Sequence, residues 1–214
     1  MPTEKLKQLI VKFPSIGFIQ TYGQTECSPR VTALLSKHSL DKVGSVGKSI
    51  PNVEVIIVDD CGEQCEPYVS GEICVRGENI MKGYYKHPDL TKEVIINGWL
   101  HTGDIGYMDN EGFIYLNGRI KNIIVTGGIN IYPEEVEEIL LSYNGVQDVC
   151  VFGEEDEILG EIPVAKIVIN RRIDCRELKK YCLERLSDYK VPVRFEVVDE
   201  LSKTYNGKII RGKR

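Results

Sequence analysis

Residue types that could contact a phosphorylated ligand occur in a few glycine-containing segments of this 214-residue sequence. The segment Tyr22-Gly23-Gln24-Thr25-Glu26 combines an aromatic ring, a hydroxyl and a carboxylate. A hydroxyl beside a carboxylate on a loop can hold a phosphate together with its metal ion. The aromatic ring three residues upstream of Thr25 could stack on a base. A solvated loop without a ligand is the alternative interpretation of this segment.

A second polar segment, Gly98-Trp99-Leu100-His101-Thr102-Gly103-Asp104, places one acid after a tight turn. A fixed carboxylate can bind the two hydroxyls of a ribose. Asp104 could instead bond its own backbone, as aspartate commonly does in turns. For Trp99 and His101 we favour packing over ligand binding.

The third segment, residues 118–133, predicts a strand, a glycine turn, a second strand and the start of a helix. Gly127 and Gly128 allow the chain to reverse or to lie close to a ligand, and Pro133 suits the first position of a helix. Arg119 and Lys121 lie where this segment begins. The alternative is a hairpin before a helix, with two solvated cations.

One apparent phosphate-binding motif, Gly44-Ser45-Val46-Gly47-Lys48-Ser49, does not meet the requirements of a Walker loop. Such a loop needs a glycine where this sequence has Lys42. Pro51 also interrupts the helix that would have to follow. We therefore interpret the segment as a structural turn.

Composition excludes several classes of protein. The net charge of −5 argues against nucleic-acid and membrane-surface binding. The seven cysteines are odd in number and irregularly spaced, and Cys61-x-x-x-Cys65 lacks a second pair, which argues against a zinc site. Reduced thiols predict a cytoplasmic protein. No signal peptide and no apolar run long enough to span a membrane is evident.

The elements that must position these residues follow from hydrophobic periodicity and turn residues. Helices are predicted at residues 3–13, 133–143 and 174–186, the last with Asp174 and Glu177 as a capping box. Strands are predicted at residues 16–20, 53–58, 72–76, 112–116, 146–152, 162–169 and 194–198.

The order of these elements predicts an α+β fold in two parts. Residues 1–117 give a lone helix and strand, as if left over from a larger α/β domain, followed by a small antiparallel β subdomain. Residues 118–214 give a compact α/β domain. The predicted boundary lies near Gly118, where the pattern changes.

Taken together and in order, the motifs closely resemble the C-terminal part of adenylate-forming enzymes. They are Tyr-Gly-x-Thr-Glu, Trp-x-x-Thr-Gly-Asp, Gly-Arg-x-Lys, Gly-Gly-x-Asn-Ile-x-Pro-x-Glu-Val-Glu and Gly-Lys-x-x-Arg. The family includes acyl-CoA synthetases, 4-coumarate–CoA ligases, luciferases and carrier-linked adenylation domains. Each motif alone is weak, but the set covers essentially the whole chain.

The resemblance implies ATP-dependent, AMP-forming activation of a carboxylic acid, followed by transfer of the acyl group to a thiol, usually that of CoA. Residues of the first part would contact the nucleotide and Mg²⁺. Tyr22 would stack on adenine beside Gly23, Thr25 would contact a phosphate, Glu26 would ligate Mg²⁺, Asp104 would bind the ribose hydroxyls and Arg119 would assist there.

In the second part, the resemblance implies that Lys208 reaches the α-phosphate and the attacking carboxylate during the first step. Gly127 and Gly128 would border the channel for the pantetheine arm in the second step. Lys121 would be the hinge about which the small domain moves between the two steps.

The chain also departs from the family. Asn122 stands where the family often has an acid, so an ion pair there would be lost. A Ser/Thr/Gly-rich loop that holds the outer phosphates is absent from the sequence, so we expect a fragment with little or no adenylating activity alone. Two alternatives are an adenylation domain that loads a carrier protein, and a truncated, inactive chain that binds nucleotide or a partner.

Overall fold

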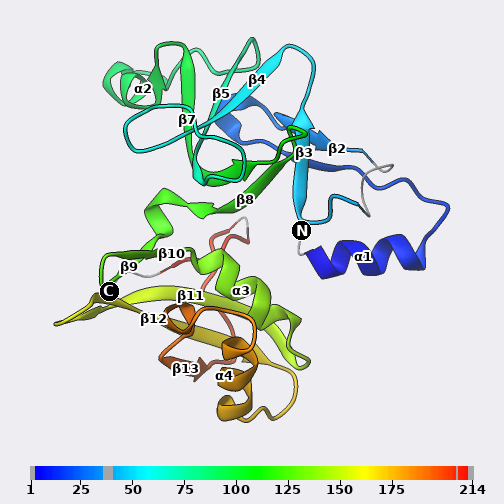
Figure 1. Cartoon of the computed structure of the whole chain (residues 1–214), viewed down its shortest axis with the longest axis vertical. Coiled ribbons are helices and arrows are strands. Elements are labelled where there is room, and N and C mark those ends of the chain that lie inside the picture. Colours follow the sequence, from blue (N-terminus) through cyan, green and yellow to red (C-terminus); the bar gives the residue numbers. More distant parts are fainter. Residues whose placement is uncertain (1–2, 36–40, 206, 212–214) are drawn as a thin grey trace. The chain divides into compact units, whose positions relative to one another are not determined.

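The computed structural model describes residues 3–35, 41–205 and 207–211. The chain splits into two compact units, unit 1 at Met1–Ile120 and unit 2 at Lys121–Arg214. Together the units contain helices and largely antiparallel sheets, so the predicted α+β class is confirmed (Figure 1).

Unit 1 is built around one antiparallel sheet of eight strands. Its strand order is β1-β2-β3-β8-β7-β5-β4, with β6 paired to β7. The elements are α1 (Thr3–Lys12), β1 (Gln20–Tyr22), η1 (Thr25–Cys27), β2 (Thr32–Leu34), β3 (Ser45–Ser49), β4 (Val53–Val58), β5 (Gly71–Gly77), α2 (Pro88–Val94), β6 (Ile95–Ile96), β7 (Trp99–Met108) and β8 (Ile114–Arg119).

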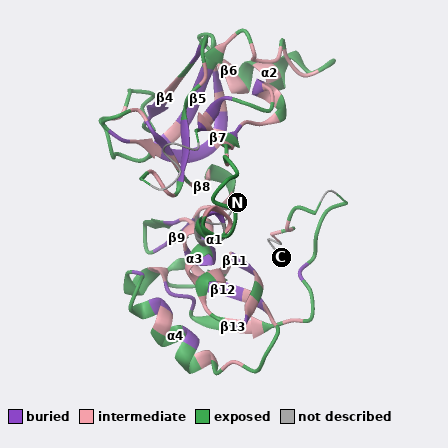
Figure 2. Ribbon diagram, turned by 90° about the vertical axis from the view of Figure 1, so that its right-hand side faces the viewer, coloured by how far each residue is buried: buried purple, intermediate pink, exposed green. Residues whose placement is uncertain are grey.

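The core of unit 1 lies along the central strands of this sheet. Figure 2 shows buried residues in purple along β4, β5 and β7. Ile73 and Val75 of β5 pack with Leu100 of β7 and Ile114 of β8, and none of the four is more than 1% exposed. Burial of β-branched and leucine side chains is the main force that holds such strands together.

The first strand differs from its prediction. Strand β1 begins at Gln20 rather than at Ile16, and the side chains of Ile16 and Ile19 are exposed. The expectation of a lone strand is wrong, because β1 pairs with β2, with Gln20 opposite Leu34. The partner was missed because three-residue strands give too little periodicity to recognise in a sequence.

Two further segments have a regular structure that the sequence did not predict. The Walker-like segment forms strand β3. In the segment that ends at Asp104, Trp99 to Asp104 lie within the ten-residue strand β7, and the predicted tight turn before the acid is the two-residue hairpin Asn97-Gly98 between β6 and β7. Gly103 has φ of +70° within β7, and the register between β5 and β7 shifts between Glu72 and Cys74, which is typical of a bulge.

Unit 2 contains a five-stranded sheet and two α-helices. The strand order is β10-β9-β12-β11, and β13 pairs with β12 in parallel. Its elements are η3 (Ile120–Asn122, which begins at the last residue of unit 1), β9 (Ile124–Thr126), β10 (Ile129–Ile131), α3 (Pro133–Ser142), β11 (Val146–Asp156), β12 (Gly160–Ile169), α4 (Cys175–Leu183), η4 (Asp188–Lys190) and β13 (Arg194–Val197).

The helices of unit 2 pack against its sheet. Leu140 of α3 and Leu178 of α4 share one buried cluster with Val151 of β11 and Ile167 of β12. The predicted start of α3 at Pro133 is confirmed. Asp174 caps α4 by accepting the backbone N–H of Arg176 at 2.8 Å, which confirms the cap itself.

Among the described residues, none of the helices has the length and apolar character needed to cross a membrane. The seven cysteines are all free thiols. Four of them, Cys27, Cys74, Cys150 and Cys182, are buried and contribute to the packed interior.

Candidate functional site

A buried carboxylate, that of Asp104, lies at the centre of a polar cluster in unit 1. Asp104 is 6% exposed. Its Oδ2 accepts a hydrogen bond from the Tyr22 hydroxyl at 2.7 Å, and its Oδ1 lies 2.6 Å from Nε of Arg119. Pairing of β7 with β8 places Asp104 directly opposite Arg119, so strand register creates this ion pair.

The Tyr22 side chain is a fixed hydrogen-bond donor. The residue is 8% exposed. Burial raises the pKa of its hydroxyl strongly, and the negative charge of Asp104 raises it further. The phenol therefore stays protonated at neutral pH and remains a donor to Asp104 Oδ2.

A carboxylate on the neighbouring strand β5 fixes the backbone just before Asp104. Glu72 Oε1 accepts the N–H of Gly103 at 2.9 Å. The hydroxyl of Thr102 donates to the carbonyl of Ile73 at 2.7 Å and accepts the N–H of Asp104 at 3.1 Å. These bonds hold the segment 102–104 in one conformation despite the break in register.

Glu72 also belongs to a group with Cys74 and His101, whose ligand-type atoms all lie within 4.8 Å of one another. Glu72 Oε2 lies 2.7 Å from His101 Nδ1, and Cys74 Sγ lies 3.5 Å from the same nitrogen. Burial and the Glu72 charge raise the pKa of the Cys74 thiol to about 12. These contacts, together with the bond from the Gly103 N–H to Glu72, hold His101 and Gly103 in place.

The loop after β1 carries the second acid of the site. Thr25 and Glu26 lie in the short helix η1. Glu26 Oε1 accepts a hydrogen bond from the Tyr84 hydroxyl at 3.0 Å, and the Glu26 carbonyl accepts the N–H of Met81 at 2.7 Å. Glu26 Oε2 has no hydrogen-bond donor among the residues that the structure describes, so this oxygen can accept a further ligand.

The loop has a structural requirement for glycine. A Cβ atom on Gly23 would lie 2.5 Å from the carbonyl oxygen of Ser28 and 2.6 Å from the backbone of Pro29. Any side chain at this position would force the loop apart, and the turn that carries Glu26 would move with it.

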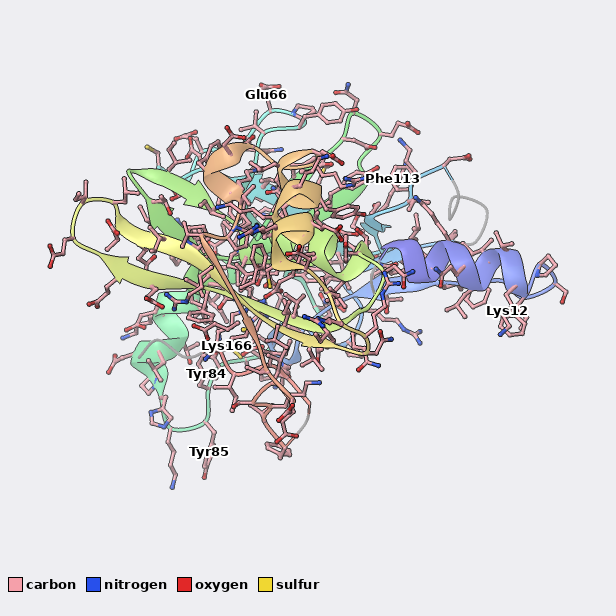
Figure 3. The ribbon with its side chains drawn as sticks, turned by 90° about the horizontal axis from the view of Figure 1, so that it is seen from below. Lys12, Glu66, Tyr84, Tyr85, Phe113 and Lys166 are labelled. Atoms are coloured by element: carbon pink, nitrogen blue, oxygen red, sulfur yellow. The ribbon has the colours of Figure 1, made fainter. Side chains whose placement is uncertain are left out.

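Sequence interpretation assigned no role to Tyr84 or to Glu72. Tyr84 is 58 residues from Glu26 in the chain, and Glu72 is 31 residues from Gly103. Figure 3 shows Tyr84 beside Tyr85, whose side chain extends away from the ribbon before α2. No local pattern in the sequence marks either contact, because both join residues that are far apart in the chain.

The remaining predicted site residues lie in unit 2. Gly127 and Gly128, with φ of +56° and +81°, form the two-residue turn between β9 and β10. Positive φ at both positions suits a tight hairpin, which glycine adopts without strain. Lys121 is exposed in η3. Asn122 donates from Nδ2 to Glu134 Oε1 at 2.8 Å. Asn122 therefore makes a hydrogen bond at the position where we expected the family's ion pair to be missing.

Lys208 lies in the polar segment that follows β13. Its side chain is exposed. Its carbonyl accepts the N–H of Thr204 at 2.8 Å, and Lys203 forms an isolated antiparallel bridge with Ile209. Lys208 is therefore presented on a small hairpin, whereas the segment was predicted only as a polar tail.

The described contacts define what unit 1 can do chemically. A preorganised carboxylate between a phenol and a guanidinium suits the binding of neighbouring hydroxyls. A second, partly free carboxylate suits a hard cation, which prefers oxygen ligands. Together these features favour the interpretation that the loop binds a phosphorylated nucleoside over the interpretation that it is a solvated loop without a ligand.

Comparison with protein families gives two matches along the chain. Residues 1–85 match the AMP-binding enzyme model. Residues 135–208 match the model of the AMP-binding enzyme C-terminal domain. One model falls within unit 1 and the other within unit 2.

Curated relatives extend these matches. The chain is 43% identical over 194 residues to 2-succinylbenzoate–CoA ligase of Bacillus subtilis, covering 91% of this chain and 40% of that protein. The ligase of the same name from Geobacillus kaustophilus is 42% identical over 202 residues, covering 94% and 41%. The chain thus spans about two fifths of the length of the curated relatives it matches.

Solved structures give the same picture. The o-succinylbenzoate CoA synthetase of Bacillus subtilis in complex with the acyl-adenylate intermediate OSB-AMP matches with a TM-score of 0.94 at 40% identity, covering 99% of this chain and 43% of that one. The amide bond synthetase McbA from Marinactinospora thermotolerans matches with a TM-score of 0.90 at 30% identity, covering 97% and 43%.

Proposed function

Because the chain belongs to the AMP-binding, or adenylate-forming, enzyme family, we propose that it is part of an ATP-dependent, AMP-forming acid–thiol ligase. Such an enzyme activates a carboxylic acid as an acyl-adenylate and transfers the acyl group to coenzyme A. The observation that carries the proposal is the buried contact of Asp104 with Tyr22 and Arg119.

In the proposed site, Asp104 binds the ribose hydroxyls and Arg119 assists it. Each carboxylate oxygen can accept more than one hydrogen bond, so Asp104 can keep its present partners while it receives the hydroxyls. The ring of Tyr22 lies next to the adenine position. Its buried hydroxyl gives it a second role, which is to hold the carboxylate in place.

Thr25 and Glu26 serve the phosphate side of the nucleotide, with Gly23 keeping their loop closed. Glu26 would hold Mg²⁺ through the oxygen that Tyr84 leaves free. Mg²⁺ suits this arrangement because it usually takes one or two carboxylates and completes its coordination with water and substrate phosphates. When bound, the ion neutralises charge on the phosphates of ATP.

Residues of unit 2 act in the two steps in turn. Lys208 places a positive charge near the α-phosphate and the attacking carboxylate, where two anions must approach each other. Gly127 and Gly128 border the path of the pantetheine arm in the second step. Lys121 is the proposed hinge.

The substrate acid that we infer is 2-succinylbenzoate or a close aromatic dicarboxylate. Support comes from the relatives at 42–43% identity, which are named for that acid. An amine in place of the thiol is the second candidate acceptor, because an amide bond synthetase matches at 30% identity. A carrier-protein pantetheine arm is a third.

Calorimetry with AMP and with a sulfamoyl analogue of the acyl-adenylate would test the nucleotide site in this chain. We expect measurable binding of AMP by the wild type. Asp104→Asn should weaken binding by roughly 10- to 100-fold, since hydrogen bonds to a charged group contribute about 1.5–3 kcal/mol. Asp89→Asn, at an exposed position in α2, is the matched control and should bind as the wild type does.

Two outcomes would contradict the proposal. One is the absence of AMP binding at millimolar concentration by a folded chain. The other is an equal loss of AMP affinity in Asp104→Asn and Asp89→Asn, which would show that AMP binding does not depend on the Asp104 cluster. Analogues that carry different acids would then distinguish 2-succinylbenzoate from other acyl groups.

A further inference from the structure

The segment that carries Lys208 folds back on itself. The N–H of Thr204 donates to the carbonyl of Lys208 at 2.8 Å, and the N–H of Ile210 donates to the carbonyl of Ser202 at 2.9 Å. Lys208 also donates its own N–H to the Thr204 hydroxyl at 3.1 Å. We call the described residues 202–205 and 207–210 the tail hairpin.

The second arm of the tail hairpin leads directly to a buried ion pair. Arg211 contacts both carboxylate oxygens of Glu137 in α3, with Nη2 to Oε2 at 2.8 Å. Its Nη1 also donates to the carbonyl of Val151 in β11 at 2.8 Å. Glu134 Oε1 lies 3.3 Å from Nη2. One side chain thus joins the tail to a helix and to a strand of unit 2.

The acid in this pair is unusually well enclosed. Glu137 is 8% exposed, and its Oε1 accepts the N–H of Val151 at 2.7 Å in addition to its contacts with Arg211. A buried charge that loses its partner is strongly destabilised, and a planar guanidinium paired through two nitrogens permits only one orientation. The pair therefore keeps the Arg211 side chain at Glu137 and fixes its orientation.

The first arm of the tail hairpin is held by a buried apolar side chain at its start, Leu201, and by a surface ion pair. Lys203 Nζ lies 2.6 Å from Asp148 Oδ2, but the lysine is 45% exposed, and exposed pairs of this kind contribute little. Arg211 is three residues beyond Lys208, a separation of about 10 Å at full extension, whereas Leu201 lies seven residues before it. The buried pair is therefore the nearer of the two fixed points that set the position of Lys208.

We propose that Arg211 is a positioning residue that holds the Lys208 side chain in its working location by clamping the tail hairpin to Glu137 and Val151. The catalytic meaning of that location rests on the role proposed above for Lys208. The clamp itself rests only on the contacts within unit 2.

Amide hydrogen exchange, followed by NMR in the ¹⁵N-labelled 214-residue chain, tests the clamp. Arg211→Gln should speed exchange at the amides of Thr204, Lys208 and Ile210 by about tenfold or more, because local opening of the hairpin no longer breaks a buried pair. The amide of Ile167 in the core strand β12 should change much less. Arg194→Gln removes a surface arginine paired with Glu154 and is the matched control.

Two further variants make the test specific. Glu137→Gln should reproduce the pattern, and the double variant should not be additive, as expected for two members of one pair. Arg211→Lys should restore part of the protection, since one amine can pair with Glu137 but cannot reproduce the fork of contacts.

The proposal is overturned if the hairpin amides keep their protection in Arg211→Gln, or if all amides of unit 2 accelerate by the same factor. The second result would make Arg211 a general stability residue. Amide hydrogen exchange reports whether the tail hairpin stays closed, and it does not depend on the catalytic role of Lys208. A failure here therefore contradicts the clamp, whereas failure to bind AMP contradicts the proposed function.

Discussion

The position of the Asp104 carboxylate depends on contacts with neighbouring side chains. Its oxygens are held by Tyr22 and Arg119, and its backbone is held through Gly103 by Glu72. In the role proposed for Asp104, a carboxylate that accepts two ribose hydroxyls gains most when it is already oriented before the ligand arrives. Positioning residues of this kind are expected to change affinity without changing the fold.

Glu72→Ala tests this dependence. Loss of the acceptor for the Gly103 N–H removes a hydrogen bond to a charged group, about 1.5 kcal/mol, which corresponds to roughly tenfold weaker AMP binding. Calorimetry on the purified chain measures the change. Glu54→Ala, which removes an exposed acid paired with Arg76 on the neighbouring strand, should leave binding unchanged; equal effects of the two substitutions would refute the role of Glu72.

Lys208 is expected to act in only one of the two half-reactions. In a full-length ligase that carries this chain, Lys208→Ala should slow formation of the acyl-adenylate by about 10²–10³-fold, the usual loss for one stabilising group in such a site. The reaction of chemically prepared acyl-adenylate with CoA should change much less. Equal slowing of both steps would show that Lys208 is a general binding or stability residue.

At the scale of single elements, the β9–β10 turn combines a structural and a proposed functional demand. Gly128 has φ of +81°, and a Cβ there would meet no atom within 4 Å. Backbone conformation alone therefore limits the choice of residue. Gly128→Val should lower the unfolding free energy by about 1–2 kcal/mol, the usual penalty of a left-handed conformation, as measured by urea unfolding.

The matched variant for this turn is Gly128→Asn, because asparagine tolerates left-handed angles. Its loss of stability should be clearly smaller than that of the valine variant. In a full-length ligase, valine should also slow the CoA-dependent step more than adenylation, the reverse of the Lys208→Ala pattern. Equal stability of the two variants would contradict the strain argument.

The turn between β7 and β8 is organised by a single acid. Asp109 is 4% exposed; its Oδ1 accepts the N–H groups of Glu111 and Phe113, and its Oδ2 pairs with Lys42 at 2.9 Å. Burial raises the pKa of the Asp109 carboxyl, but the bonds from Lys42 and from the backbone outweigh it and hold the pKa below its ordinary value. An acid with a lowered pKa stabilises the fold above its unfolded pKa and loses this contribution as pH falls through its folded value.

Unfolding of unit 1 should therefore become easier below about pH 4. Asp109→Asn should destabilise the unit at pH 7 by about 1.5–3 kcal/mol, through loss of charge-assisted bonds, and should reduce the difference in stability between pH 7 and pH 3. Urea unfolding of both proteins at the two pH values measures this. An unchanged pH dependence in the variant would show that other acids control it.

At the scale of the whole chain, each unit has its own buried cluster. The units meet in the sequence between Ile120 and Lys121, within η3 and close to the proposed boundary at Gly118. Limited trypsin digestion should cut after Arg119 or Lys121 and release a stable fragment corresponding to unit 2, since linkers open more readily than packed elements. A first cut inside α3 would contradict this prediction, and mass spectrometry of the early products decides it.

Elements with strong periodicity or clear end signals are predictable from their residues alone. Strand β4 and the starts of α3 and α4 follow from apolar patterns, Pro133 and Asp174. The order and spacing of five short motifs indicated the family. Local properties of this kind are contained in a single stretch of chain.

Contacts between distant residues depend on the three-dimensional fold. Pairing of β7 with β8 places Arg119 opposite Asp104, and the fold brings Tyr84 to Glu26 and Arg211 to Glu137. No periodicity records such contacts, because a hydrogen bond between residues 58 or 74 positions apart depends on strand register and on packing. A tyrosine or an arginine in a polar segment has the same local signal whether it is solvated or holds a buried acid.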